Sequence, residues 1–128
     1  MNITEDYVSF EIAKLLKEKG FDEKLQYYYD TDGILVRCRR GQYFSNKSNA
    51  FIAPTLQMVM KWLRENKNFN INNKLTIHGY FCSISHIVKD SMGYIIDIED
   101  SEAWETPYYH TYKEACEAAI KYCLENII

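Results

Sequence analysis

The sequence predicts an α+β fold in the order α-β-β-α-β-β-α, with a mainly antiparallel sheet packed by helices. Three stretches carry the apolar spacing of helices, and two pairs of strand-forming runs flank turns rich in Asp and Gly. Such short turns join antiparallel strands, whereas parallel strands need long crossovers. The 128 residues, 47% of them hydrophobic, indicate a single globular domain spanning residues 1–128, which is long enough to bury its own core.

The first helix is predicted to begin at Ser9 and to run to Lys19. Ser9 is a favourable N-cap, and Glu11 lies in the first turn, where the helix dipole favours an acidic side chain. Gly20 suits the left-handed position that ends a helix. The inward stripe of this helix comprises Ile12, Leu15 and Leu16.

Residues 25–29 and 34–38 are rich in strand formers, and the Asp30-Thr31-Asp32-Gly33 segment between them predicts a hairpin turn. The same segment is no calcium loop, because Ile34 occupies the position of the third ligand. Residues 39–52 are predicted to be irregular, and a loop of this length is uncommon inside a compact domain.

The central helix is predicted over residues 54–66, with Pro54 near its first turn or Thr55 as an alternative N-cap. Trp62 lies at one margin of its apolar face and Met58 widens that face. The apolar stripe itself comprises Leu56, Val59, Met60 and Leu63. An apolar arc this wide predicts that the helix is covered on more than one side, by a sheet and by something else.

The C-terminal half is predicted to hold the second hairpin and the last helix. Residues 75–88 form one long strand or two short ones broken near Gly79, followed by a turn at 89–93 and a strand at 94–99. Residues 100–109 are expected to be irregular. The Thr111-Tyr112-Lys113-Glu114 sequence is a capping box and predicts the start of the last helix.

Composition limits the classes of function. The net charge of −3 argues against a dedicated binder of duplex nucleic acid, which presents a basic face to phosphates. The N-terminal residues lack the basic and apolar regions of a signal peptide, and no apolar run is as long as a membrane helix, so we expect a cytoplasmic protein. The four cysteines show no CxxC pair and are interpreted as small buried side chains in a reducing compartment.

Segments in all three predicted helices resemble a family of short uncharacterised proteins from gut Bacteroides-type bacteria and their prophages. The matching segments are Val8–Leu15 running on to Lys19-Gly20-Phe21-Asp22, then Ala53-Pro54-Thr55 with Lys61-Trp62-Leu63-Arg64-Glu65, and Tyr112-Lys113-Glu114-Ala115. The resemblance does not extend to residues 39–51 or 70–105. It implies no activity, only a small cytosolic protein encoded on phage-derived or other mobile DNA.

The sequence contains no GxSxG, Walker, HExxH or GxGxxG motif, and we predict a protein that is not an enzyme and that needs no cofactor or metal. His78, Cys82 and His86 would share one face of a continuous strand, but neighbouring members would lie roughly 13 Å apart. That separation is too long for one metal ion to bridge.

The leading hypothesis is a non-enzymatic module that acts through protein–protein contact, as a homodimer or as an accessory factor of a mobile element. Aromatic and Met side chains are enriched at the centres of interfaces, so the candidate interface residues are Met58, Trp62 and Tyr80. The alternative is an accessory protein that binds single-stranded nucleic acid through the loop from Arg37 to Lys47, where cations and rings are interleaved. Its candidate residues are Arg37, Arg39, Arg40, Tyr43 and Phe44.

Overall fold

The computed structural model describes residues 6–43, 45 and 49–128. It contains three α-helices and two antiparallel three-stranded sheets, which confirms the predicted α+β class. The chain divides into two compact units, Met1–Leu56 and Gln57–Ile128.

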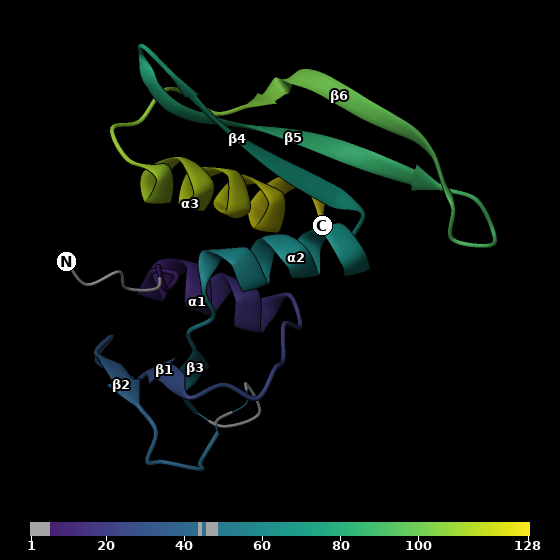
Figure 1. Cartoon of the computed structure of the whole chain (residues 1–128). Coiled ribbons are helices and arrows are strands. Elements are labelled where there is room, and N and C mark those ends of the chain that lie inside the picture. The colour runs from purple at the N-terminus through teal and green to yellow at the C-terminus, as the bar shows by residue number, and fades with distance from the viewer. Residues whose placement is uncertain (1–5, 44, 46–48) are drawn as a thin grey trace. The chain divides into compact units, whose positions relative to one another are not determined.

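The first unit holds one helix and one small sheet (Figure 1). Its elements are α1 (Phe10–Glu18), β1 (Tyr27–Tyr29), β2 (Leu35–Arg37) and β3 (Phe51–Ile52). The strand order is β2-β1-β3 and both pairings are antiparallel, so β2 is an edge strand. Helix α1 packs beside β3, the strand at the other edge.

The predicted ends of α1 are confirmed. The Ser9 side chain accepts a hydrogen bond from the amide of Ile12 at 3.4 Å, as an N-cap does. At the other end Gly20 has φ +85°, and the amide of Phe21 donates to the carbonyl of Leu16 at 3.0 Å. This ending folds the buried Phe21 ring back toward the apolar side of the helix.

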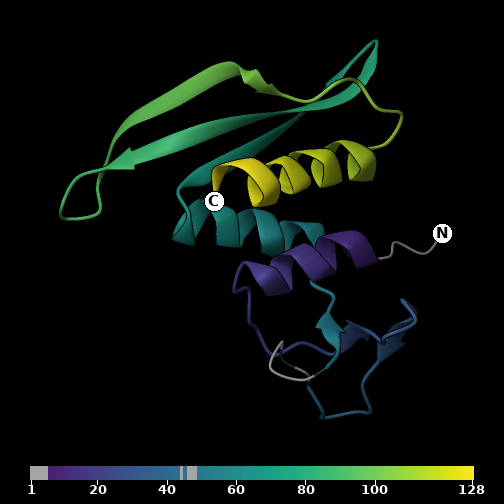
Figure 2. The same cartoon turned by 180° about the vertical axis from the view of Figure 1, so that it is seen from behind.

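The second unit contains a longer sheet and two helices (Figure 2). Its elements are α2 (Leu56–Asn66, whose first residue belongs to the first unit), β4 (Phe69–Thr76), β5 (Gly79–Lys89), β6 (Ile95–Glu105), α3 (Tyr112–Tyr122) and a terminal π-helical turn (Cys123–Ile127). The strand order is β4-β5-β6, so β6 is an edge strand as well. Helix α3 packs against β4 and β5, and the Gln57 amide of α2 donates to the Tyr112 hydroxyl of α3 at 3.4 Å.

Helix α3 begins at the predicted capping box. The Thr111 hydroxyl accepts from the amide of Glu114 at 3.1 Å and donates to its carboxylate at 2.9 Å. The buried face of the helix carries small side chains, which allow close packing on the sheet. These residues are Ala115, Cys116 and Ala119, with Ile120 beside them.

Strand boundaries differ from the prediction in three places, each decided by pairing between distant segments. Residues 51–52 form β3 inside the stretch predicted to be irregular, because they pair with Tyr28 and Tyr29. The break near Gly79 is a hairpin turn, with β4 running back to Phe69 along β5. Strand β6 continues to Glu105, beyond the predicted end at residue 99, because it still pairs with Ser83 there. The order is therefore α-β-β-β-α-β-β-β-α.

Candidate functional site

The free end of the β5–β6 hairpin, residues 88–100, is the most exposed part of the second unit, and we call it the hairpin arm. Helix α3 has 11 residues and the π-helical turn that continues it has 5, so together they span about 24 Å, whereas the 11 residues of strand β5 span about 36 Å. The helix is therefore too short to cover the hairpin. In Figures 1 and 2 the arm extends past the ends of α2 and α3. Every residue from 89 to 100 is exposed.

Hydrogen bonds within the turn fix the tip of the arm. One carboxylate oxygen of Asp90 accepts from the amides of Met92 and Tyr94, both at 2.9 Å. The amide of Asp90 donates to the carbonyl of Tyr94 at 2.9 Å, and Gly93 adopts φ +89°. A glycine meets this left-handed conformation at little cost, so the sequence specifies the turn.

The arm presents a cluster of large apolar side chains to solvent. Their exposed fractions run from 57% for Ile98 to 78% for Met92. The cluster comprises Met92, Tyr94, Ile95, Ile96 and Ile98. Single exposed apolar residues are ordinary, but a contiguous group of this kind marks an interaction surface.

Carboxylates lie within and after the apolar cluster along β6. They are Asp97, Glu99, Asp100, Glu102 and Glu105. Because β6 is an edge strand, its outer backbone groups face no strand of its own sheet. Charged side chains on an exposed edge discourage pairing with an identical edge, since like charges would lie opposite one another. The arm is thus both apolar and acidic.

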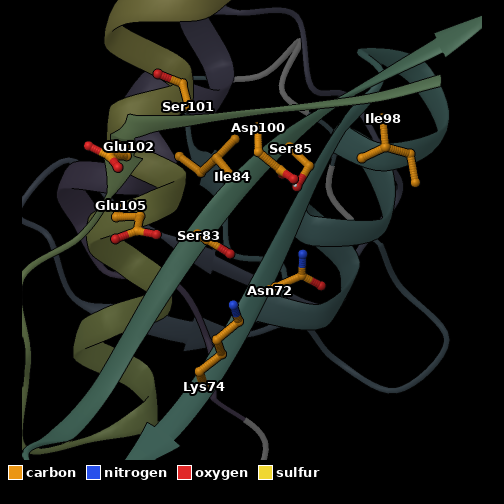
Figure 3. Close-up of a pocket in the computed structure, with 10 residues that line it drawn as sticks. All are labelled: Asn72, Lys74, Ser83, Ile84, Ser85, Ile98, Asp100, Ser101, Glu102 and Glu105. Carbon is orange, nitrogen blue, oxygen red and sulfur yellow. Dashed lines mark hydrogen bonds between the residues drawn. The ribbon is translucent and has the colours of Figure 1, made fainter.

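Two irregularities shape β6. Val88 pairs with Asp97 while Lys89 pairs with Ile95, so Ile96 is an extra, bulged residue. Farther along, four residues of β6 lie between the partners of Ser83 and Ser85, opposite a single residue of β5. The second irregularity borders a hollow of about 430 Å³, shown in Figure 3.

The hollow is polar and open. Side chains of β4, β5 and β6 surround it, and the Ser85 hydroxyl donates to the Asp100 carboxylate (Figure 3). Its other polar lining residues include Asn72, Lys74, Ser83, Glu102 and Glu105. Among the described residues no buried side-chain nitrogen or oxygen lacks a hydrogen-bond partner, and no cluster of three His, Cys, Asp or Glu is arranged to hold a metal. Nothing in the hollow therefore points to a particular ligand.

The environment of the buried thiols in the second unit disfavours reactivity. The Asn73 amide donates to the sulfurs of Cys82 and Cys116 at 3.3 and 3.6 Å. The hydrogen bond with Cys116, followed by burial, raises the pKa of the Cys82 thiol, and burial raises the pKa of Cys123 to about 12. Nucleophilic and metal-binding chemistry both need the thiolate, which this environment disfavours. The cysteines act as small core residues here.

The predicted interface residues lie on two elements. Met58 and Trp62 are on α2, where Met58 is 37% exposed and the Lys67 ammonium lies 5.5 Å from the centre of the half-buried Trp62 ring. Tyr80 is half-buried on β5, with its ring edge-on to Tyr112. None of these three side chains is as exposed as the apolar residues of the arm.

His78, Cys82 and His86 do not converge. His78 lies in the β4–β5 turn against the ring of Tyr108, and Cys82 is buried beside Cys116. The His86 ring stacks on Phe69 with centroids 5.0 Å apart, and its Nδ1 lies 3.4 Å from the Glu99 carboxylate.

The arginines of the predicted nucleic-acid patch are exposed in the first unit. Arg37 ends β2, with its guanidinium 6.0 Å from the centre of the Tyr27 ring, and Arg39 and Arg40 follow it. Tyr43 is 58% exposed. Phe44 and Lys47 lie outside the described residues.

The hairpin arm was not among the predicted sites, although the sequence carries a signal for it. The turn at Asp90 reproduces the turn at Asp30, where the carboxylate accepts from the amides of Asp32 and Ile34 at 2.9 and 3.0 Å. In each case an Asp-x-x-Gly turn precedes three large apolar residues, the last two of which lie on an edge strand. In the first hairpin the apolar residues are followed by arginines, and in the second they are followed by carboxylates. This parallel between the two hairpins is the signal that the sequence carries.

The chain matches no protein-family model, no curated protein and no solved structure.

Proposed function

We propose that this protein is a non-enzymatic, cytoplasmic protein–protein interaction module that self-associates through the hairpin arm. The observation that carries the proposal is the exposure of Met92, Tyr94, Ile95, Ile96 and Ile98 on one projecting hairpin. Complete burial of an isoleucine side chain is worth about 1.5–3 kcal/mol. Covering the exposed halves of three isoleucines is worth on the order of 3 kcal/mol, enough to contribute substantially to an interface.

The turn supports the same conclusion. Asp90 and Gly93 hold the hairpin closed at its tip, so the apolar side chains are displayed on an ordered strand pair. A surface that is ordered before binding loses less conformational entropy on association than a disordered one. The resemblance to prophage-encoded proteins suggests a role as an accessory factor of a mobile element.

The test is to measure the mass of the purified protein by analytical ultracentrifugation over a wide range of concentration. We expect a reversible dimer or higher assembly for the wild type. The double substitution Ile95→Ser and Ile96→Ser removes apolar contact area from the arm, and we expect it to weaken association about tenfold or more.

The matched control is Leu75→Ser with Ile77→Ser, because these residues are 68% and 97% exposed but lie outside the arm. We expect this variant to associate like the wild type. A wild type that stays monomeric at every concentration would contradict self-association. Equal weakening by both double variants would show that the arm has no special role.

Binding of single-stranded nucleic acid is a second candidate, favoured by the exposure of Arg37, Arg39 and Arg40 and of Tyr43, which follows them in the sequence. It predicts binding of a labelled single-stranded oligonucleotide that weakens steeply with salt and is lost when Arg39 and Arg40 are replaced by Glu. Absent or salt-insensitive binding would eliminate this candidate.

A further inference from the structure

We propose that the occupant of the hairpin arm is the basic edge strand β2 of a second copy of this chain. The inference rests on the proposed function, because it names the surface that the arm contacts when the protein self-associates. We call this second surface the basic edge and define it as residues 34–40.

The basic edge has the same combination of exposure and strand position as the arm. β2 is the outer strand of the sheet in the first unit, and Ile34 and Leu35 are 60% and 40% exposed. Arg37 ends β2, Arg39 and Arg40 lie just beyond the strand, and all three are exposed. This edge therefore presents apolar side chains followed by cations, whereas the arm presents apolar side chains followed by carboxylates.

Charge decides which pairs of edges are compatible. Two copies of β6 paired parallel and in register would bring Asp97, Glu99 and Asp100 against the same carboxylates, and two basic edges paired in the same way would crowd their arginines. Like charges opposite one another destabilise a strand pair, and opposite charges stabilise it. The acidic hairpin arm is therefore repelled by the arm of a second copy and attracted by its basic edge. Both effects favour pairing of the arm with the basic edge.

The two segments also match residue by residue when they run parallel. Aligning Gly33 with Gly93 sets Ile34, Leu35 and Val36 against Tyr94, Ile95 and Ile96. The same alignment sets Arg37 against Asp97, Cys38 against Ile98, Arg39 against Glu99 and Arg40 against Asp100. Each arginine thus has a carboxylate as its counterpart.

The carboxylates of the arm can accept further hydrogen bonds from arginine side chains. Asp100 accepts one hydrogen bond from Ser85, and the Glu99 carboxylate lies 3.4 Å from His86, with its side chain 57% exposed. A carboxylate accepts several hydrogen bonds and suits the forked donors of an arginine. Both intramolecular contacts can therefore persist in the complex.

The experiment exchanges charges between the two edges. One variant, Arg37→Glu with Arg39→Glu, makes both edges acidic, and a second, Asp97→Lys with Glu99→Lys, makes both edges basic. We expect each variant alone to associate at least about tenfold more weakly than the wild type, because its two edges now repel. We expect an equimolar mixture to regain association. The two acidic surfaces of the first variant can then each pair with an oppositely charged surface of the second variant.

Charge-matched controls reverse two charges each at exposed residues outside both edges: Lys61→Glu with Arg64→Glu, and Glu65→Lys with Glu18→Lys. We expect these substitutions to leave association unchanged. Failure of the mixture to associate would overturn the proposal. The proposal would be overturned in the same way if the two edges paired within one chain, because mixing two variants could not then restore association between copies. If self-association needs Ile95 and Ile96 but withstands all four charge reversals, the arm remains the interface and the basic edge is not its partner. A monomeric wild type would instead remove the proposed function itself.

Discussion

At the scale of single residues, Gly79 shows how a contact between distant segments constrains the backbone. Its φ is +118°, and a Cβ at this position would lie 2.5 Å from the carbonyl oxygen of Tyr109. The adjacent Tyr80 exchanges two backbone hydrogen bonds with Tyr109, at 2.8 and 2.7 Å. Any side chain at residue 79 must therefore push apart the start of β5 and the segment that leads into α3.

We predict that Gly79→Ala lowers the free energy of unfolding by about 3 kcal/mol, which combines backbone strain with weakened hydrogen bonds. Urea denaturation measures the loss. Gly93→Ala is the control, because Gly93 also has positive φ but has nothing within 4 Å of the added Cβ. We expect it to cost only about 1 kcal/mol, the penalty of the left-handed conformation. Equal losses would show that the clash with Tyr109 is relieved easily.

At the scale of elements, local chemistry determines where helices and turns begin, and distant pairing determines how long strands are. Ser9 and the Thr111–Glu114 pair identify two helix starts from the sequence, and Asp90 with Gly93 identifies the second hairpin turn. The two residues of β3 and the last six of β6 were not predictable in this way. Their extended conformation depends on partners far away in the chain.

The exposure of the candidate site is not evident from the sequence, for a related reason. Residues 94–99 have the composition of a half-buried strand, and no local feature says that a helix fails to cover them. Their exposure follows from the different lengths of α3 and β5, which is a property of two elements together. The predicted Met58, Trp62 and Tyr80 have the residue types of an interface but are less exposed than the arm.

We predict that Asp90→Ala loosens the hairpin arm without unfolding the rest of the second unit. The substitution removes the acceptor for the amides of Met92 and Tyr94, which lie in an exposed turn. Hydrogen exchange of the amides in residues 88–98 should accelerate about tenfold, while those of α3 stay protected. Asp90→Asn is the control, because asparagine keeps an acceptor oxygen and is common in such turns. Unchanged exchange in the alanine variant would show that the turn does not depend on Asp90.

At the scale of the whole molecule, the response to salt distinguishes the contact that we propose from a purely apolar one. Each copy has a net charge of −3, so two copies repel overall, and screening that repulsion would tighten their association. Pairs of opposite charge at the interface have the contrary effect, because salt weakens their attraction and so weakens the association.

We predict that self-association weakens several-fold between low and high sodium chloride, because the short-range pairs between the arm and the basic edge outweigh the long-range repulsion. Sedimentation at a series of salt concentrations measures the effect. The variant with Asp97→Lys and Glu99→Lys, mixed with its acidic counterpart, should show the same trend. Tighter association of the wild type at high salt would indicate an interface held by apolar contact alone.

The repeated turn has a consequence for engineering of the chain. Asp30–Gly33 and Asp90–Gly93 make the same hydrogen bonds in the same order, although one turn is flanked by three-residue strands and the other by strands of eleven residues. The four residues therefore adopt the same turn conformation between short strands and between long ones. Placing Asp-Thr-Asp-Gly at the tip of the arm would remove Met92 and add a negative charge while preserving the hairpin, so the recognition surface can be rewritten without redesigning the fold.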